Sequence, residues 1–432
     1  MEWLGYAKTG FTHAKQPRVV QDKQGAKTDL LKIVEKTTPP CVLNPLLLNG
    51  HMQTLWSATK PVGPKIYYKR KVFESNHETF VGTFAVDFVV DEYEGEDATL
   101  FRRTTYFSEE EFKQFESDDE KPMVIIMHGV AGGSHEVYLR HAVAPLVEAG
   151  WEACVINSRG CAKSELNSRF LYNGRATWDI RQASPPMSLP KESWKLTTSL
   201  AREMVEGEVP EQASICSGIL SGRKHAHKQG ENCLLSGAVV CSNPFNLEIS
   251  NTLLSGQYLG TKYLNMVKDA LVAYVKKHRS VLEEHLDIEA VSKVKSMEEF
   301  DRLVECAIWG YPTEAAYYRD ASSSDSVLAI RIPFLAIHAL DDPVAPKEAV
   351  PWQEFKQNPN TVLLTTSMGG HISWYESGGG RWFPKAIAGF LNHLAFQADP
   401  ESLGAVSYIK DDEDNKNIEY VGTRRKMLIE QY

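Results

Sequence analysis

Two polar side chains near the carboxyl terminus follow strand-like runs, and their types suit acid–base chemistry. Asp342 comes after the run 330–338 and before a proline, where a carboxylate could hold the tautomer of a histidine. His371 comes after the run 361–366 and two glycines. An acid after one strand and a histidine after the next is the order of acid and base in a hydrolase triad. Asp341, directly before Asp342, is the alternative acid.

A glycine-rich turn could supply the donors that stabilise an oxyanion. The turn HGVAGGS spans residues 128–134 and directly follows the apolar run 122–127. Glycines at such a turn let backbone amides point toward a developing negative charge, and the N–H of Val130 is the favoured donor. A purely structural tight turn is the alternative. Taken together, the turn, the acid and the base predict an α/β-hydrolase fold with a mostly parallel sheet and helices on both faces.

The nucleophile of such a triad is missing from the chain as written. An α/β-hydrolase carries its serine in Gly-x-Ser-x-Gly on a sharp turn from strand to helix, and no such pentapeptide occurs in the 432 residues. Ser221 lies in GILSG, where the glycines do not flank it at both two-residue offsets. Ser217 fits no better, and Ser236 lies in a strand-like run that favours packing. We therefore assign no nucleophile.

The elements that must position these residues follow an α/β pattern. Strand-like runs lie at 82–90, 122–127, 151–157, 330–338 and 361–366. A helical pattern at 138–149 separates two of these runs, which indicates a βαβ unit and hence parallel strands. The run 82–90 alternates with period two and indicates an early antiparallel strand. An amphipathic helix is expected at 383–394.

These patterns predict one hydrolase domain at residues 41–400 with additions. Residues 1–40 are expected to form an N-terminal arm, and residues 401–432 a charged tail. Helical patterns over about 250–325 resemble a cap over the catalytic face, although ordinary core helices would show the same spacing. Residues 183–229 stand apart as an anomalous segment.

Composition excludes several classes of function. The net charge is −9 and no block of Lys or Arg is typical of a nucleic-acid-binding face, which argues against binding to DNA or RNA. No metal site is expected, because the seven cysteines are scattered without a CxxC or Cys/His spacing. The chain shows neither a secretory signal nor a stretch of ~18 apolar residues. We expect a cytoplasmic protein with free thiols, including peripheral contact with lipid droplets or an intracellular membrane.

Seven motifs make the resemblance specific. They look like the α/β-hydrolase family that contains fungal medium-chain fatty-acid ethyl ester synthase/esterases and related abhydrolases. In chain order, the motifs are NPLLLNGHMQTLW, MHGVAGGSHEVYLR, VINSRGCAKSEL, LYNGRATWDIR, LSGAVVCSNPFNLE, IHALDDPVAP and GGHISWYE. The resemblance implies a serine esterase, acylglycerol lipase or alcohol acyltransferase. Its substrates would be medium-chain acyl esters or monoacylglycerols, with ethanol and acyl-CoA as partners in transfer, and no metal or organic cofactor is needed.

Residues 183–229 depart from the family, which has a helix, a strand and a Gly-x-Ser-Leu-Gly elbow there. Read one nucleotide downstream, the codons of residues 218–229 permit Gly-(Phe/Tyr)-Ser-Leu-Gly followed by Ala-Asn-Met-Leu-Thr-Asn. The junction of Met204 and Val205 forces a Trp codon, and flanking codons permit Lys-Trp-Leu-Lys and Phe-Pro-Asn-Arg-Pro-Leu-Phe-Ala. We infer a shifted reading frame. The alternative is divergence into a non-catalytic protein of the same fold that binds a lipid or a partner.

Overall fold

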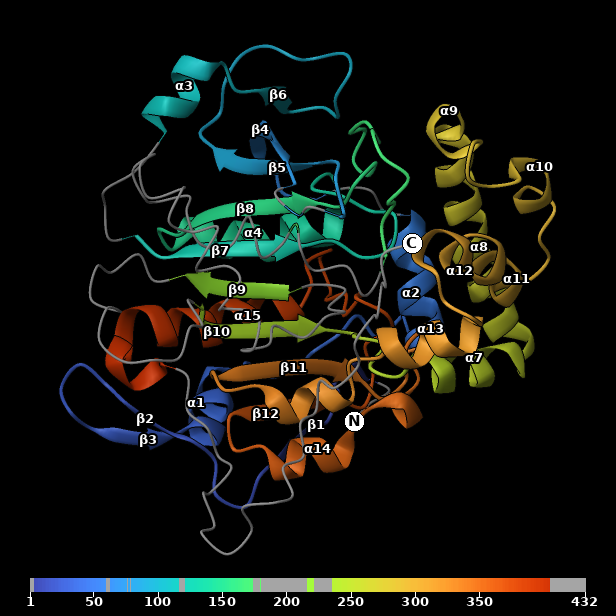
Figure 1. The fold of residues 1–432 in the computed structure, drawn as a ribbon. Helices are drawn as coiled ribbons and strands as arrows, with labels where there is room; N and C mark the ends of the chain where they lie inside the picture. The colour runs from blue at the N-terminus through green and yellow to red at the C-terminus, as the bar shows by residue number, and fades with distance from the viewer. Residues whose placement is uncertain are drawn as a thin grey trace, which may run out of the picture.

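Hydrogen bonds between strands build one ten-stranded sheet in the part of the chain that the computed structural model describes (Figure 1). The structure describes residues 4–59, 63–75, 77, 79–115, 121–173, 179, 216–220 and 235–404, with the backbone alone for 216–220. The strand order is β1-β12-β11-β10-β9-β7-β8-β5-β4-β6, and β2 and β3 form a separate ribbon.

Strands and helices alternate along the described chain. The strands are β1 Thr9–His13, β2 Val19–Gln21, β3 Lys27–Asp29, β4 Tyr67–Glu74, β5 Thr83–Val90, β6 Thr104–Tyr106, β7 Met123–Met127, β8 Glu152–Asn157, β9 Cys216–Leu220, β10 Leu235–Cys241, β11 Phe334–Ala339 and β12 Thr361–Thr366. The helices are α1 Leu30–Thr37, α2 Gly50–Thr59, α3 Glu109–Gln114, α4 Val137–Glu148, α7 Leu247–Ser255, α8 Tyr258–Lys277, α9 Arg279–Leu282, α10 Ile288–Val291, α11 Met297–Leu303, α12 Glu305–Trp309, α13 Glu314–Ala321, α14 Trp352–Gln357 and α15 Phe383–Asn392. Short helical turns are η3 Asp325–Ala329, η4 Lys347–Ala349, η5 His393–Gln397 and η6 Pro400–Leu403.

The predicted α/β fold is confirmed in its central part. β7 and β8 pair in parallel with α4 between them in the chain, which is the expected βαβ unit. β10, β11 and β12 also pair in parallel, whereas β4 and β5 form the expected early antiparallel pair. Since parallel strands all point the same way, the carboxyl ends of these five strands meet at one edge of the sheet.

β9 lies between β7 and β10 but runs antiparallel to both, and its arrow in Figure 1 points against theirs. Its last residue, Leu220, pairs with Met123 and Leu235, the first residues of the two neighbouring strands. The strands on either side keep their parallel directions. Apart from the backbone of β9, the anomalous segment 183–229 lies outside the described residues.

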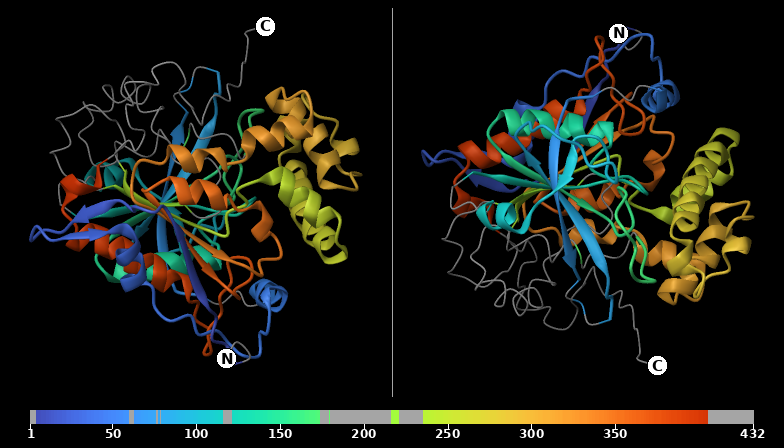
Figure 2. Two further views of the ribbon diagram at one scale, coloured as in Figure 1. Left: turned by 90° about the horizontal axis from the view of Figure 1, so that it is seen from below. Right: turned by 90° about the horizontal axis from the view of Figure 1, so that it is seen from above.

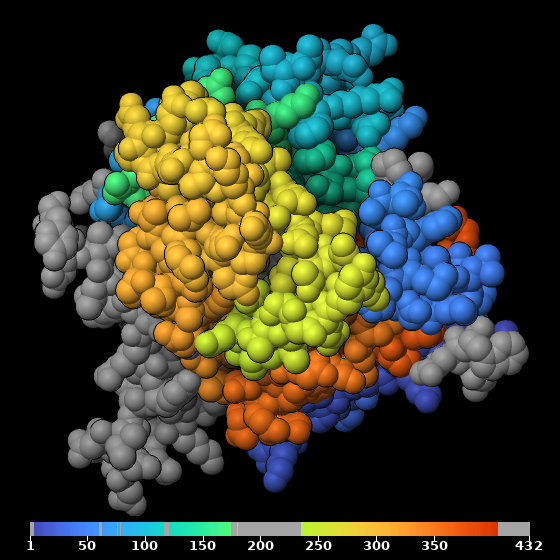
Figure 3. Space-filling model, turned by 90° about the vertical axis from the view of Figure 1, so that its right-hand side faces the viewer, coloured from blue at the N-terminus to red at the C-terminus, as the bar shows by residue number. Residues whose placement is uncertain are grey.

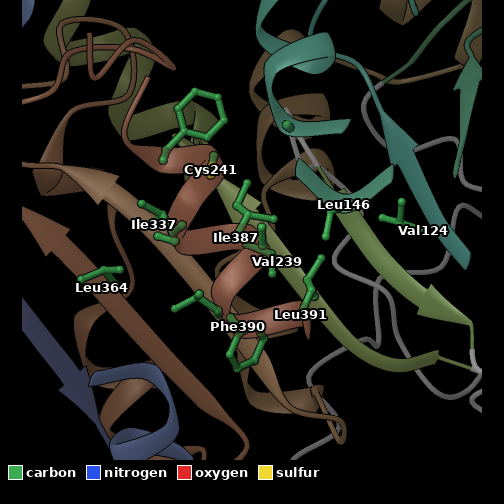
Figure 4. Packing of buried hydrophobic residues seen from close by; sticks show 14 of the residues in the cluster. Val124, Leu146, Val239, Cys241, Ile337, Leu364, Ile387, Phe390 and Leu391 are labelled. Atoms are coloured by element: carbon green, nitrogen blue, oxygen red, sulfur yellow. The ribbon is translucent and has the colours of Figure 1, made fainter. Parts of the chain in front are cut away.

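Helices cover both faces of the sheet. Successive side chains of each strand point to opposite sides, so apolar side chains on both faces must be buried. Val124 and Ile126 of β7 pack with α4 and α15 in one buried cluster, while Ile125 between them belongs to a cluster on the other face. Figure 4 shows the first cluster, with Ile387 and Phe390 of α15 against the strands. Each such fully buried side chain contributes about 1.5–3 kcal/mol.

The N-terminal segment is not the arm that its polar sequence predicted. β1 pairs antiparallel with β12 and forms an edge of the sheet. α1 buries Leu30, Ile33 and Val34 against the core, so this segment belongs to the domain. At the other end, η6 still packs on the domain through Leu403, and the predicted charged tail beyond residue 404 lies outside the described residues.

Helices α7 to α13 form a block of their own, which we call the helical insertion. The block lies to one side of the sheet, beyond the carboxyl end of β10 (Figures 1 and 2). Its hydrophobic cluster contains Leu271, Val275, Phe300 and Val304. Within the described residues, no helix combines the length and the apolar character needed to cross a bilayer.

Two buried carboxyl groups lie inside the helical insertion. The Asp301 carboxyl accepts a hydrogen bond from the Tyr318 hydroxyl (2.5 Å), and Glu305 accepts one from the side-chain amide of Asn173 (2.6 Å). Burial raises the pKa of Asp301 to about 7, although the bond from Tyr318 opposes the increase. Burial and the charge of Asp301 raise the pKa of Glu305. The insertion is therefore most stable when these groups are protonated.

We predict that Asp301→Asn makes the stability of the insertion less dependent on pH. A carboxyl whose folded pKa lies above its unfolded value stabilises the fold when it is protonated. That stability is fully present below the unfolded pKa of about 4 and is lost as the pH rises through the folded pKa, which is about 7. The midpoint of thermal unfolding should therefore fall less steeply between pH 5 and 8 in the variant than in the parent protein. An unchanged slope would contradict the raised pKa of Asp301 as the source of the pH dependence. Asp325→Asn serves as the control.

Candidate active site

Asp342 and His371 meet at the carboxyl edge of the parallel strands. β11 and β12 pair in register from Phe334 with Thr361 to Ala339 with Thr366, so the segments that follow both strands leave the sheet side by side. The Nδ1 atom of His371 lies 3.2 and 3.1 Å from the two carboxylate oxygens of Asp342. The side chain of Asp342 is 0% exposed, whereas that of His371 is 22% exposed. The acid is thus buried behind a partly accessible base.

The surroundings of Asp342 keep it ionised. Burial by itself would raise its pKa, but the charge and hydrogen bond of His371 outweigh burial and lower the pKa below its usual value. The backbone amides of Val344 and Ala345 also donate to Oδ1, each at 2.8 Å. An anionic carboxylate that accepts the Nδ1 proton leaves Nε2 of the imidazole free to accept a proton.

The alternative acid, Asp341, has another set of contacts. Its Oδ1 accepts a hydrogen bond from the backbone amide of Gly370 (3.0 Å), one residue before the histidine. Burial raises the pKa of Asp341. The structure therefore places Asp342 on the imidazole and Asp341 on the backbone of the loop that carries it.

The glycine-rich turn after β7 occupies the same edge of the sheet. Ala131 has a positive φ of 54°, a conformation that side chains other than glycine adopt at a cost. Val130 is half exposed, and no hydrogen bond between described residues uses its backbone N–H. The Gly129 amide donates to the Tyr138 hydroxyl (2.8 Å), which holds the start of the turn. Among the described residues, the Val130 amide therefore has no hydrogen-bond partner, which is compatible with the oxyanion role expected from the sequence.

A buried ion pair that we did not expect from the sequence supports this turn. Arg70 of β4 donates to both carboxylate oxygens of Asp87 on β5, at 2.6 and 2.7 Å. The same carboxylate accepts from the Ser134 hydroxyl and from the side-chain amide of Asn157 (2.8 Å). The Asn157 oxygen in turn accepts from the Ser134 backbone amide at 2.9 Å. The network ties the end of the turn to the sheet.

Comparisons with known proteins place the chain in a family. No family model matches it. A monoacylglycerol lipase of Saccharomyces cerevisiae is 32% identical over 375 residues, which cover 80% of this chain and 79% of that protein. From the same organism, medium-chain fatty acid ethyl ester synthase/esterase 2 is 26% identical over 404 residues, or 81% and 84% of the two chains. Phospholipase ABHD3 of Mus musculus is 30% identical over 264 residues, 59% of each chain.

The chain belongs to the abhydrolase family. This confirms the resemblance drawn from the seven motifs, and with it membership of a family of lipid ester hydrolases. Among the described residues of this abhydrolase, no group of three His, Cys, Asp or Glu side chains could hold a metal ion.

The hydrolase triad expected from the sequence needs a serine at the same edge as His371. The two described serines that the sequence offered, Ser217 and Ser236, lie elsewhere. Ser236 is the second residue of β10, at the end of the strand remote from His371. Ser217 lies within β9, paired with Ile126 and Val239, and Ser221 falls outside the described residues. In the part of the chain that is described, the His371 imidazole forms a hydrogen bond with Asp342 and with no serine hydroxyl.

The buried ion pair of this abhydrolase generates a prediction about stability. Arg70→Met should lower the free energy of unfolding by about 3–5 kcal/mol, because it leaves the Asp87 carboxylate buried without its cation. Urea unfolding monitored by tryptophan fluorescence measures the change.

The neighbouring residue offers a matched control. Lys71 pairs with the exposed Glu109 at 2.6 Å on the other face of the same strand. Exposed pairs contribute about 0–1 kcal/mol, so Lys71→Met should have a small effect. Equal losses in the two variants would refute the structural importance of the Arg70–Asp87 pair.

Proposed function

We propose that this abhydrolase acts on acyl esters as a serine esterase, with His371 as the base and Asp342 as the acid of its triad. The contact between the His371 imidazole and the buried Asp342 carboxylate is the observation that supports this most directly. The names of the relatives agree with it, since they include a lipase, an esterase and a phospholipase. In this proposal the N–H of Val130 is one oxyanion donor.

The reaction would follow from these positions. Nε2 of His371 takes the proton of the serine hydroxyl as the oxygen attacks the ester carbonyl, and Asp342 stabilises the imidazolium that forms. The negative charge on the carbonyl oxygen is held by the Val130 amide and the amide after the serine. The imidazolium then protonates the departing alcohol. Water or a second alcohol attacks the acyl-enzyme, with His371 again as the base.

The substrates we propose are medium-chain acyl esters and monoacylglycerols. The two yeast relatives carry names with these substrates, and the second name includes ester synthesis. In transfer, ethanol would replace water as the acceptor and acyl-CoA would serve as an acyl donor. Peripheral contact with a lipid droplet or membrane is supported by three exposed leucines. Leu46 and Leu48 precede α2, and Leu55 lies within it. The helical insertion would be the cap over this site.

The serine itself, we propose, is encoded in a shifted frame across residues 218–223. The direction of β9 supports this. A nucleophile elbow follows its strand at the carboxyl edge of the sheet, whereas β9 ends at the opposite edge, beside the first residues of β7 and β10. β9 thus fills the place expected for the nucleophile strand but ends at the edge away from His371.

Sequencing the transcript across the codons of residues 182–230 tests the frame. We predict an open frame that encodes Gly-(Phe/Tyr)-Ser-Leu-Gly, in phase with the codons before and after the segment. A stop codon within the shifted frame, or a transcript that reads as the printed sequence throughout, would count against the proposal.

Activity measurements test the chemistry. The chain as written should lack turnover of a medium-chain p-nitrophenyl ester, because loss of a triad nucleophile costs on the order of 10⁶ in kcat. The protein with the shifted segment restored should hydrolyse the ester and react with a fluorophosphonate probe. His371→Ala or Asp342→Asn in the restored protein should abolish most turnover. Comparable labelling of the unrestored chain would reveal a different nucleophile.

A non-catalytic protein of the same fold that binds a lipid or partner is the competing proposal. The reversed β9 favours it, if the printed sequence is the expressed one. The transcript separates the two cases. A transcript that encodes the elbow serine supports the esterase, whereas one without it supports a protein that binds its ligand and lacks hydrolysis.

A further inference from the structure

Helix α2 has an unusual buried face. It lies within the motif NPLLLNGHMQTLW, which is rich in apolar residues. The structure buries only Gly50 and Gln53 of this helix, and the side chain of Gln53 is fully buried although polar. A helix that buries polar groups must give them hydrogen-bond partners, since an unpaired buried group costs about 1–3 kcal/mol. The hydrogen-bond partners of these polar groups therefore show which segment of the chain α2 binds.

The partners lie on the loop that carries the histidine. The Thr54 hydroxyl accepts the backbone N–H of His371 at 2.9 Å and donates to the Gly50 carbonyl at 2.7 Å. The side-chain oxygen of Gln53 accepts the backbone N–H of Tyr375 at 2.8 Å. One turn of α2 thus binds the loop at the histidine itself and four residues further on.

The start of α2 touches the loop without any side chain between them. A Cβ at Gly50 would lie 1.9 Å from the carbonyl oxygen of Asp341, and one at Gly370 would lie 2.5 Å from the Gly50 carbonyl. Both positions therefore require glycine. The hydrogen bond from the Gly370 amide to the Asp341 carboxylate lies at the same contact. The start of α2, the turn that contains Asp341 and the loop that contains His371 are thus packed against one another.

The loop needs such support because its own backbone is strained. Ile372 and Trp374 have positive φ angles of 50° and 41°, which cost of order 1–3 kcal/mol each in residues other than glycine. Such conformations persist only where the surroundings hold them. Ser242, after β10, supplies a further anchor by accepting the Ile372 amide at 3.1 Å.

The outer side of α2 contacts the helical insertion. Nδ1 of His51 lies 3.0 Å from the Tyr263 hydroxyl of α8, and the two rings stack with centroids 5.7 Å apart. Figure 3 shows α2, in blue, beside the yellow-green α8 on this face of the molecule. The helix is therefore held from both sides, which makes it a rigid support for the loop.

We propose that α2 sets the position of the catalytic base and that Thr54 is the positioning residue, acting through the backbone of His371. The proposal rests on the triad role of His371 set out above. Without the Thr54 oxygen, the His371 amide loses its acceptor and the strained loop can relax away from Asp342. A displacement of about 1 Å is enough to cost roughly 10²-fold in rate.

A spectroscopic test needs no catalysis and uses the chain as written. A histidine Nδ1 proton held against a carboxylate gives a downfield proton resonance, which His371→Ala and Asp342→Asn should remove and so assign. Thr54→Val should remove or broaden this resonance, because valine keeps the shape but not the acceptor. Thr54→Ser should retain it. Thr59→Val is the matched control, since Thr59 lies exposed on the last turn of the same helix and its hydroxyl donates to the Trp56 carbonyl, with no contact to the histidine loop among the described residues.

Kinetics in the protein with the restored serine give the second readout. Thr54→Val should lower kcat about 10–100-fold with KM within about twofold, and Thr54→Ser should recover most of the rate. An unchanged resonance and kcat in a folded Thr54→Val protein would overturn the positioning role, as would equal losses in Thr59→Val. If the restored parent hydrolyses no ester, the proposed function fails, whereas the resonance still decides the role of Thr54.

Discussion

The parallel pairing of β11 with β12 is the constraint on which the candidate site depends. Each of the six residues in either strand is buried, and the strands pair in register along their whole length. Alternate side chains of β11 belong to different buried clusters, Leu335 and Ile337 to one and Phe334 and Ala336 to another on the opposite face. A shift by one residue would turn every side chain to the other face, so these two clusters fix the register. The register in turn brings Asp342 and His371 out at one edge within hydrogen-bond distance. A buried carboxylate without that partner would be costly, and the strand packing is what supplies it.

The parts of the fold that the sequence predicted are those with strong periodic signals. β7, β8 and β12 are buried on both faces and stand out as short runs rich in apolar or β-branched residues, and α15 shows a clear apolar stripe. The Asp342–His371 pair followed from its place after two such runs. β1 was missed because it is short and polar, and its partner β12 lies at the other end of the chain. Pairings of that kind leave no local pattern.

The polar supports of the site were also beyond a reading of the sequence. Arg70 lies in the run KRK and resembles a solvent-facing charge, yet it pairs across the sheet with Asp87 as its direct neighbour. In the sequence, Gln53 and Thr54 lie between apolar residues, Met52 and Leu55, which the structure exposes. In both cases the partner is set by strand register or by loop packing, and neither has a fixed spacing along the chain. Hydrogen-bonded supports of this kind become visible only in three dimensions.

β9 satisfies the backbone hydrogen bonding of its neighbouring strands, but it does not have the direction that the proposed catalysis requires. The gap between β7 and β10 leaves N–H and C=O groups of both strands without partners, and a strand can satisfy them in either direction because every residue carries the same backbone groups. Almost any extended segment can therefore fill the gap. Direction decides the chemistry, since only a parallel strand delivers its following turn to the edge where His371 lies. In β9 it is Cys216, the first residue, that pairs with Val240 near that edge. A strand can thus complete the hydrogen bonding of the sheet without ending at the edge where His371 lies.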